Sequence, residues 1–252
     1  MKVALFSDVH ANMPALEAVL DDIDQQSVDA VYCLGDLVGY APWPNEVIET
    51  IRKHHIPTIA GNYDFGVGRN SDDCGCAYKT DEEKTWGARS IGYTNEVITE
   101  SNRDYLKSLP AHLRLEVGRG KAKDSLLLVH GSPRKINEYL FEDRPDKSFR
   151  RMMAKADARL LAFGHTHKPF HKVLAGSHGV RHAVNIGSVG KPKDGDPRAC
   201  YVILEWGELD FADPESLSVE FRRGSYDVEK SAVAIEESRL PNSFAEMLRE
   251  AY

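Results

Sequence analysis

Short apolar runs that stop at a glycine or a polar side chain recur along the whole chain. Runs of about 4–8 apolar residues without helical spacing are typical of buried strands. The predicted strands are residues 2–6, 29–34, 56–60, 113–117, 125–129, 161–163, 180–184, 199–206 and 218–223, with a Gly/Lys turn between the fourth and fifth. We expect the last two strands to complete a second sheet.

Helical spacing of apolar residues separates several of these runs. In residues 15–23, Leu16, Val19 and Ile23 fall on one face, and Pro14 suits the first turn of a helix. Other predicted helices are residues 46–54, 146–156, 227–237 and 243–250, the last two packed on the outside. Asn45 is the expected N-cap of the helix at 46–54. Strands that alternate with helices predict a mixed α/β fold.

Residues 65–109 carry few strand signals and combine a loop rich in Gly, Asn, Asp and Cys with a helical stretch. A long connection of this kind is usually functional, so we interpret it as a cap that sets specificity. Cys74 and Cys76 could bind a metal, but their spacing and the lack of a second pair favour ordinary loop cysteines. Because the sequence has no repeat or linker, we expect a single domain over residues 1–252, ending in the strands and helices of 199–252.

Composition and charge restrict the class of protein. The chain has 252 residues, 42% of them hydrophobic and 28% charged, as in ordinary enzymes. A net charge of −7 argues against general nucleic-acid binding, so an anionic substrate would need local cations such as bound metals. Four cysteines do not resemble an extracellular disulfide framework. With no signal peptide or membrane span recognisable, we expect a soluble cytoplasmic protein.

Potential metal ligands follow the predicted strands. They are Asp8, His10, Asp36, Asn62, His130, His165 and His167. Ligands of α/β proteins gather beyond the carboxyl ends of strands. One His-x-His alone is more often a pair of ordinary polar histidines, but several such units together favour a site. Nitrogen and oxygen donors without thiolate suit Mn, Fe, Zn, Ni or Co better than Ca. Two such ions would generate a nucleophile from water and clamp a phosphoryl group.

Five motifs in order resemble the signature of the calcineurin-like metallophosphoesterases. They are Asp8-x-His10, Gly35-Asp36-x-x-Gly39, Gly61-Asn62-x-Asp64, His130-Gly131 and Gly164-His165-x-His167. The turn at residues 185–188 is also similar to the small prokaryotic phosphodiesterase branch, so the resemblance extends from Met1 to about Pro192. It implies an αββα fold, a two-sheet β-sandwich flanked by helices.

The resemblance also implies a ligand set. Asp8, His10 and His167 would bind one divalent transition-metal ion, and Asn62, His130 and His165 the other. Asp36 would bridge them, and Asp64 would orient a neighbouring group. The implied activity is hydrolysis of phosphodiester or phosphoanhydride bonds in a small, nucleotide-like substrate. A protein serine/threonine phosphatase and a non-catalytic scaffold are the alternatives. Neither a membrane partner nor an oligomeric state is predicted.

Tyr63 departs from the family pattern, which has a histidine near the leaving group. A phenol with an ordinary pKa of about 10 is a poor proton donor at neutral pH. We therefore expect phosphoanhydrides, such as dinucleoside polyphosphates, or diesters with acidic leaving groups to be hydrolysed better than alkyl phosphomonoesters. Alternatively, Tyr63 only packs under the cap, and another histidine such as His171 or His182 acts as the acid.

Overall fold

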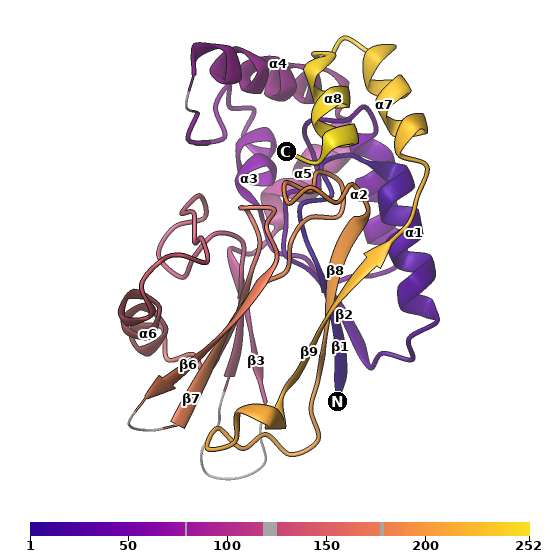
Figure 1. Ribbon diagram of the computed structural model, residues 1–252. Coiled ribbons are helices and arrows are strands. Elements are labelled where there is room, and N and C mark those ends of the chain that lie inside the picture. Colours follow the sequence, from indigo (N-terminus) through magenta and orange to yellow (C-terminus); the bar gives the residue numbers. More distant parts are fainter. Residues whose placement is uncertain (79, 118–124, 177–178) are drawn as a thin grey trace.

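Two β-sheets form the centre of the computed structural model, which describes residues 1–78, 80–117, 125–176 and 179–252 (Figure 1). The first sheet has the order β2-β1-β8-β9 and the second the order β3-β4-β5-β7-β6. The strands of the first are β1 (Lys2–Phe6), β2 (Ala30–Cys33), β8 (Ala199–Glu205) and β9 (Ser218–Gly224). Those of the second are β3 (His112–Glu116), β4 (Ser125–Val129), β5 (Leu160–Phe163), β6 (Phe170–Gly176) and β7 (Gly179–Asn185).

Parallel pairing brings several strand ends to one end of the sandwich. β1 is parallel to β2, and β4, β5 and β7 are parallel to one another, whereas β8, β9, β3 and β6 each pair antiparallel. The inner faces of the sheets share one apolar core, in which Val3 and Leu5 of β1 belong to the same cluster as Leu128 of β4 and Ala162 of β5. Burial of this core fixes the two sheets face to face.

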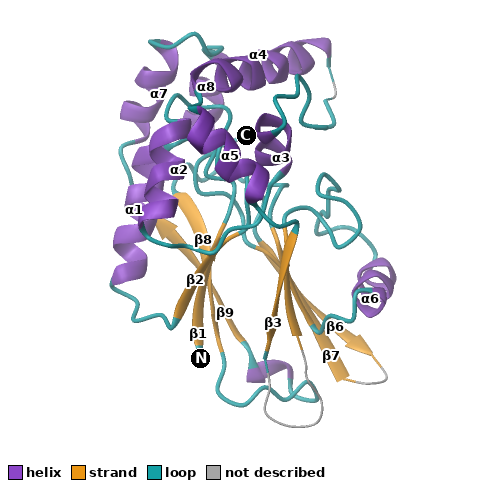
Figure 2. Ribbon diagram, turned by 180° about the vertical axis from the view of Figure 1, so that it is seen from behind, coloured by secondary structure: helices purple, strands orange, loops and turns teal. Residues whose placement is uncertain are grey.

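Helices flank both outer faces and gather at one end of the sandwich (Figure 1). Their bounds are α1 (Met13–Asp24), α2 (Pro44–Lys53), α3 (Asn62–Gly68), α4 (Asp81–Val97), α5 (Glu100–Ser108), α6 (Asp146–Lys155), α7 (Val228–Glu236) and α8 (Ser243–Glu250). Figure 2 shows α1 and α2 beside the first sheet and α6 beside the second, on opposite sides of the sandwich. Among the described residues, no helix is long and apolar enough to cross a bilayer. The layered α/β sandwich agrees with the expected fold class.

Several predictions of elements are wrong. Residues 56–60 form no full strand; Thr58 makes only an isolated bridge to Cys33, because Pro57 has no N–H to extend the ladder. The strands β8 and β9 join β1 instead of completing a second sheet. Asn45 is not an N-cap, since the helix starts at Pro44 and the Asn45 side chain bonds the backbone of Val97 and Thr99. The predicted turn of residues 118–124 lies outside the described residues.

Two histidines on β6 and β7 provide a pH-dependent contribution to stability. His182 is 1% exposed and its Nδ1 lies 3.0 Å from Nε2 of His171. Burial, and then His171, lower the pKa of His182 to about 4. Between pH 6.5 and 4, His182 is protonated in the unfolded chain but stays neutral in the folded protein. The free energy of unfolding therefore falls as the pH falls.

Replacement of His182 by glutamine should reduce this pH dependence. Between pH 6.5 and 4.5, wild type is expected to lose about 1 kcal/mol more of its free energy of unfolding than His182→Gln, after allowance for screening. Urea unfolding at both pH values measures the difference. Equal losses in the two proteins would contradict the assignment, and His54→Gln on an exposed position serves as the matched control.

Candidate metal centre

The predicted ligands follow β1, β2, β4 and β5 or, in the case of Asn62, begin α3. Figure 1 shows α3 and α8 at the same end of the sandwich. Six of the predicted ligands form two groups, and within each group the ligand atoms lie within 4.8 Å of one another. The groups are Asp8, His10 and His167, and Asp36, His130 and His165. Each of these side chains is at most 4% exposed. Residues as far apart in the sequence as Asp8 and His167 therefore share one buried centre.

Short distances join the members of the first group. His167 Nε2 lies 3.1 Å from Asp8 Oδ1 and 3.1 Å from His10 Nε2. The second group is equally close, with His130 Nε2 at 3.3 Å from Asp36 Oδ2 and 3.1 Å from Asn62 Oδ1. Asn62 thus lies beside the second group.

Asp36 lies between the two groups. Its Oδ2 is 3.3 Å from His130 Nε2 and 3.7 Å from His10 Nε2. Its Oδ1 accepts a hydrogen bond of 2.8 Å from the backbone N–H of Tyr63, which fixes the carboxylate. This placement is what a bridging carboxylate requires.

Backbone carbonyls orient three of the imidazoles. Nδ1 of His10 lies 3.0 Å from Val38 O, and Nδ1 of His130 lies 2.9 Å from Leu34 O. Nδ1 of His167 lies 2.6 Å from Lys191 O. Because a carbonyl only accepts, each Nδ1 carries a proton, and each Nε2 is the nitrogen directed at the centre.

Two buried atoms of the centre make no hydrogen bond. They are Asp8 Oδ1 and His165 Nε2. An unsatisfied buried polar atom costs about 1–3 kcal/mol. A carboxylate oxygen and an imidazole nitrogen can each give a lone pair to a cation. The residues present therefore fit metal ions.

Burial and mutual charge shift the pKa values of the centre in opposite directions. Burial lowers the pKa of His10 to about 3 and of His165 to about 4. Burial would also lower the pKa of His130, but the carboxylates of Asp36 and Asp8 raise it to about 10. Burial, partly offset by His130, raises the pKa of Asp8. The carboxylates thus hold a proton on His130, whereas His10 and His165 stay neutral, so the centre favours a positive charge beside its anionic oxygens.

Five of the candidate ligands adopt the left-handed backbone conformation. Their φ angles are 55° for Asp8, 48° for His10, 53° for Asp36, 65° for His165 and 59° for His167. Such conformations are uncommon for residues with a Cβ and concentrate at functional sites. The loops after the strands therefore hold strain at the positions that face the centre.

Comparison with known proteins agrees with this geometry. The model of the calcineurin-like phosphoesterase superfamily domain matches residues 1–208. The chain belongs to the calcineurin-like phosphoesterase superfamily.

Relatives of similar length support the assignment. An uncharacterized protein from Methanocaldococcus jannaschii is 34% identical over 260 residues, which cover 98% of this chain and 96% of the relative. The crystal structure of a metallophosphoesterase from Sphaerobacter thermophilus is 31% identical, with a TM-score of 0.73 and 100% coverage of both chains. That of a hypothetical protein from Pyrococcus horikoshii is 25% identical, with a TM-score of 0.79 and coverage of 98% and 97%. The protein is thus a hydrolase of the metallophosphoesterase class.

Asp64 and Tyr63, which follow Asn62 in the superfamily motif, are both buried. Asp64 accepts backbone hydrogen bonds from Gly61 and Leu37, each 2.9 Å long. It therefore ties the loop that carries Asp36 to the turn that carries Asn62. Burial, followed by Asp36, raises the pKa of Asp64 to about 7.

The Tyr63 ring packs at 5.5 Å from the His10 ring and 4.9 Å from the Tyr40 ring, measured between centroids. Its hydroxyl makes no hydrogen bond, and burial, with Tyr40 next, raises its pKa well above 10. The alternative acid His182 pairs with Leu160 at the amino end of β5, whereas the centre follows the carboxyl end of that strand.

Three contacts around the centre were not predicted from the sequence. Tyr139 packs on His165 with ring centroids 4.1 Å apart. The helix α8, expected only to cover the outside, places Phe244 on Tyr40 at 4.9 Å and Met247 Sδ at 3.5 Å from Lys191 Nζ. Aromatic or Met residues carry no motif that would assign them to the centre, so only the fold reveals these contacts.

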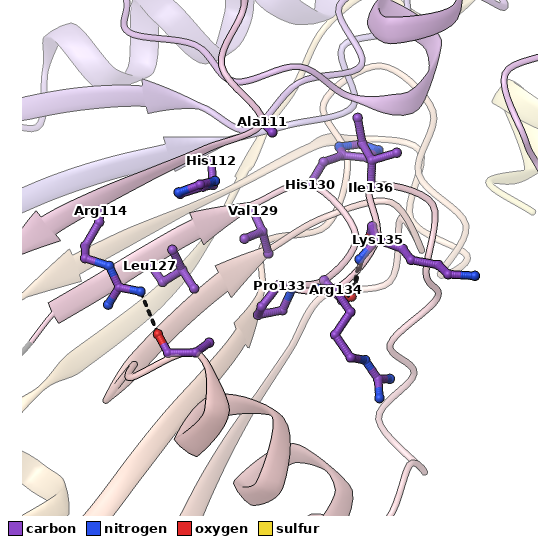
Figure 3. A pocket seen from close by; sticks show the side chains of 12 residues that line it. Ala111, His112, Arg114, Leu127, Val129, His130, Pro133, Arg134, Lys135 and Ile136 are labelled. Atoms are coloured by element: carbon purple, nitrogen blue, oxygen red, sulfur yellow. Dashed lines mark hydrogen bonds between the residues drawn. The ribbon is translucent and has the colours of Figure 1, made fainter.

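A separate pocket of about 290 Å³ lies against β3 and β4 (Figure 3). It shares His130 with the metal centre and is lined by Arg114, Arg134 and Lys135 among others. Arg134 already pairs with Glu138, and Arg114 donates to Asp157 O at 2.7 Å. Two of its cations are therefore neutralised or hydrogen-bonded within the protein itself.

Gly61 is required for the close approach of two loops of this phosphoesterase. A Cβ there would lie 2.0 Å from Asp36 Oδ1 and 2.2 Å from Asp36 N. Gly61→Ala should displace Asp36 and lower the free energy of unfolding by about 1–3 kcal/mol. Denaturant unfolding measures the loss. At Gly207 a Cβ would meet nothing within 4 Å, so Gly207→Ala is the control; similar stability of both variants would refute the packing argument.

Proposed function

We propose that this protein is a two-metal-dependent phosphoesterase that hydrolyses phosphodiester or phosphoanhydride bonds in a small, nucleotide-like substrate. The observation that carries the proposal is the pair of buried nitrogen-and-oxygen groups with Asp36 between them. In such sites two divalent ions supply a nucleophile from water at neutral pH and neutralise phosphoryl oxygens. The donor set suits Mn, Fe, Zn, Ni or Co.

The distances between the residues suggest how they would divide between the two ions. Asp8, His10 and His167 hold one ion, while His130, His165 and Asn62 hold the other, with Asp36 shared. Asp64 acts indirectly, since its two backbone hydrogen bonds keep Asp36 and Asn62 in register. Carbonyl partners keep the imidazoles from rotating, so the centre is organised before substrate arrives.

Tyr63 sets the class of leaving group. With a pKa well above 10, the phenol gives up its proton too weakly to assist an alkoxide at neutral pH. A phosphate or other stabilised anion departs without a proton. Phosphoanhydrides, including dinucleoside polyphosphates, and diesters with acidic leaving groups are therefore the favoured substrates.

A substrate panel with variants at position 63 tests this proposal. Wild-type kcat/KM with Mn should be at least about 100-fold higher for diadenosine tetraphosphate than for glycerol phosphate. Tyr63→His should raise turnover of glycerol phosphate by about 10²-fold and leave the dinucleotide nearly unchanged. Tyr63→Phe is the matched control and should change neither rate by more than about threefold. Equal or faster wild-type turnover of alkyl phosphates would reject the preference.

Residues 65–109 are proposed to set substrate specificity. Two contacts support this role, since the amide of Asn62 bonds Cys74 O and Cys76 Sγ of that segment. The scaffold alternative is less supported because every predicted ligand is present in the centre. Equilibrium dialysis separates the two functions, since the enzyme should retain close to two ions and a scaffold could retain none.

A further inference from the structure

Two cysteines lie in contact beside the metal centre. Cys74 Sγ and Cys76 Sγ are 3.3 Å apart in the segment between α3 and α4. Cys74 is 7% exposed and Cys76 is half-buried, whereas Cys33 and Cys200 are completely buried in strands of the first sheet. A disulfide has an S–S distance of about 2.05 Å, so the two sulfurs need to approach by only about 1 Å.

The turn between the cysteines is held in place. Gly75 has a φ of 71°, which a residue with a Cβ rarely adopts. Its N–H donates to Asp73 Oδ1 at 2.8 Å, and its carbonyl accepts from Asn137 Nδ2 at 2.8 Å. These bonds fix the turn in which the two sulfurs lie 3.3 Å apart and Cys76 Sγ contacts the Asn62 amide.

The same segment orients the Asn62 amide. Its Nδ2 donates to Cys74 O at 3.0 Å and to Cys76 Sγ at 3.3 Å. Since an NH₂ group bonds acceptors only, these two contacts turn Oδ1 toward His130 Nε2, 3.1 Å away. Any reaction that moves Cys76 Sγ removes one of the two contacts that point Oδ1 at the centre.

We propose that Cys74 and Cys76 are a modification site that hydrogen peroxide converts to a reversible disulfide, and that the disulfide releases the Asn62 amide. The consequence for metal binding rests on the proposed role of Asn62 as a ligand. One thiol reduces the peroxide O–O bond to give a sulfenic acid and water. The second sulfur attacks the sulfenic sulfur; the S–S bond forms, and the hydroxyl leaves with the thiol proton as a second water. Two thiols lose two electrons and two protons, and one peroxide becomes two waters.

Peptide mass spectrometry tests the chemistry. Reduced, chelator-treated protein is exposed to hydrogen peroxide, quenched with catalase and digested with trypsin. Residues 70–79 form one tryptic peptide that contains both cysteines and no other. Its mass should fall by about 2 Da, the loss of two hydrogens in disulfide formation, and dithiothreitol should restore it.

Three variants sharpen this test. Cys74→Ser and Cys76→Ser should each abolish the 2 Da loss, whereas Cys200→Ser, in β8, should retain it. A peptide that stays unmodified, gains sulfinic acid or joins Cys33 or Cys200 would overturn the proposal.

Metal titration tests the consequence for Asn62. Oxidised wild type should bind the more weakly held Mn ion at least about tenfold less tightly than reduced protein in calorimetry. Cys76→Ser treated with peroxide should bind as its reduced form does. Equal Mn binding by oxidised and reduced wild type would overturn the release of Asn62. Neither readout requires turnover, so an inactive protein that forms the disulfide would reject the proposed hydrolysis and leave the modification site standing.

Discussion

Asp36→Asn is expected to lower kcat by about 10³-fold or more on every substrate that wild type hydrolyses. The amide keeps the carboxylate shape and can still accept from the Tyr63 N–H through Oδ1. Its NH₂ group then replaces Oδ2, which faces His130 and His10. A hydrogen-bond donor then occupies the position where both ions need an anionic oxygen. The centre should therefore also lose affinity for metal.

Steady-state kinetics and equilibrium dialysis measure the two effects of Asp36→Asn. Asp196→Asn makes the same chemical change in an ion pair with Arg198 and should leave both readouts unchanged. Turnover by Asp36→Asn within about tenfold of wild type would exclude a bridging role.

Removal of metal should lower the Tm more than any of the substitutions proposed above. Without ions, Asp8 Oδ1 and His165 Nε2 are buried with no hydrogen bond, and Asp8 is buried near Asp36, which adds to the rise in its pKa. An ion at about 1,000 times its Kd stabilises the folded state by about 4 kcal/mol. For a chain of this length, that corresponds to a Tm increase of about 8–16 °C for each ion.

Calorimetry of chelated protein titrated with Mn measures this increase. Asp8→Asn should retain the response of the second group only, so its Tm should rise about half as far. Calcium provides the ion control because it prefers oxygen ligands and this centre is rich in imidazole. An identical Tm in chelator and in Mn would contradict a metal centre.

The sequence predicted the fold class and the side chains that gather at one end of the sandwich, but it missed several of the strands around them. Asp8, Asp36 and His165 each follow an apolar run, and parallel strands bring such ends together whatever the rest of the fold does. β6, which pairs with β7, was missed because polar and apolar residues do not alternate regularly along it. Residues 56–60 were apolar enough for a strand. Pro57 has no N–H, however, so the backbone hydrogen bonds of a full strand do not form.

Contacts that depend on distant segments could not be read from local pattern. The carbonyl of Lys191 that orients His167 has no side-chain signature, and neither has the packing of Phe244 on Tyr40. The expected sheet of the last two strands was wrong for the same reason, since nothing near residues 199–205 indicates that β1 is the neighbour. Local sequence thus indicated the candidate ligands, whereas long-range packing determined the contacts around them.

The pairing of β1 with β8 has a consequence for biosynthesis. Residues 2–5 pair with residues 202–205, so an interior strand of the first sheet remains without one neighbour until most of the polypeptide has left the ribosome. Closure of so long a loop is slow and leaves an apolar edge open to aggregation. Nascent chains that end before β8 should therefore be recognised by chaperones, and assembly of this enzyme should finish only after translation has nearly ended.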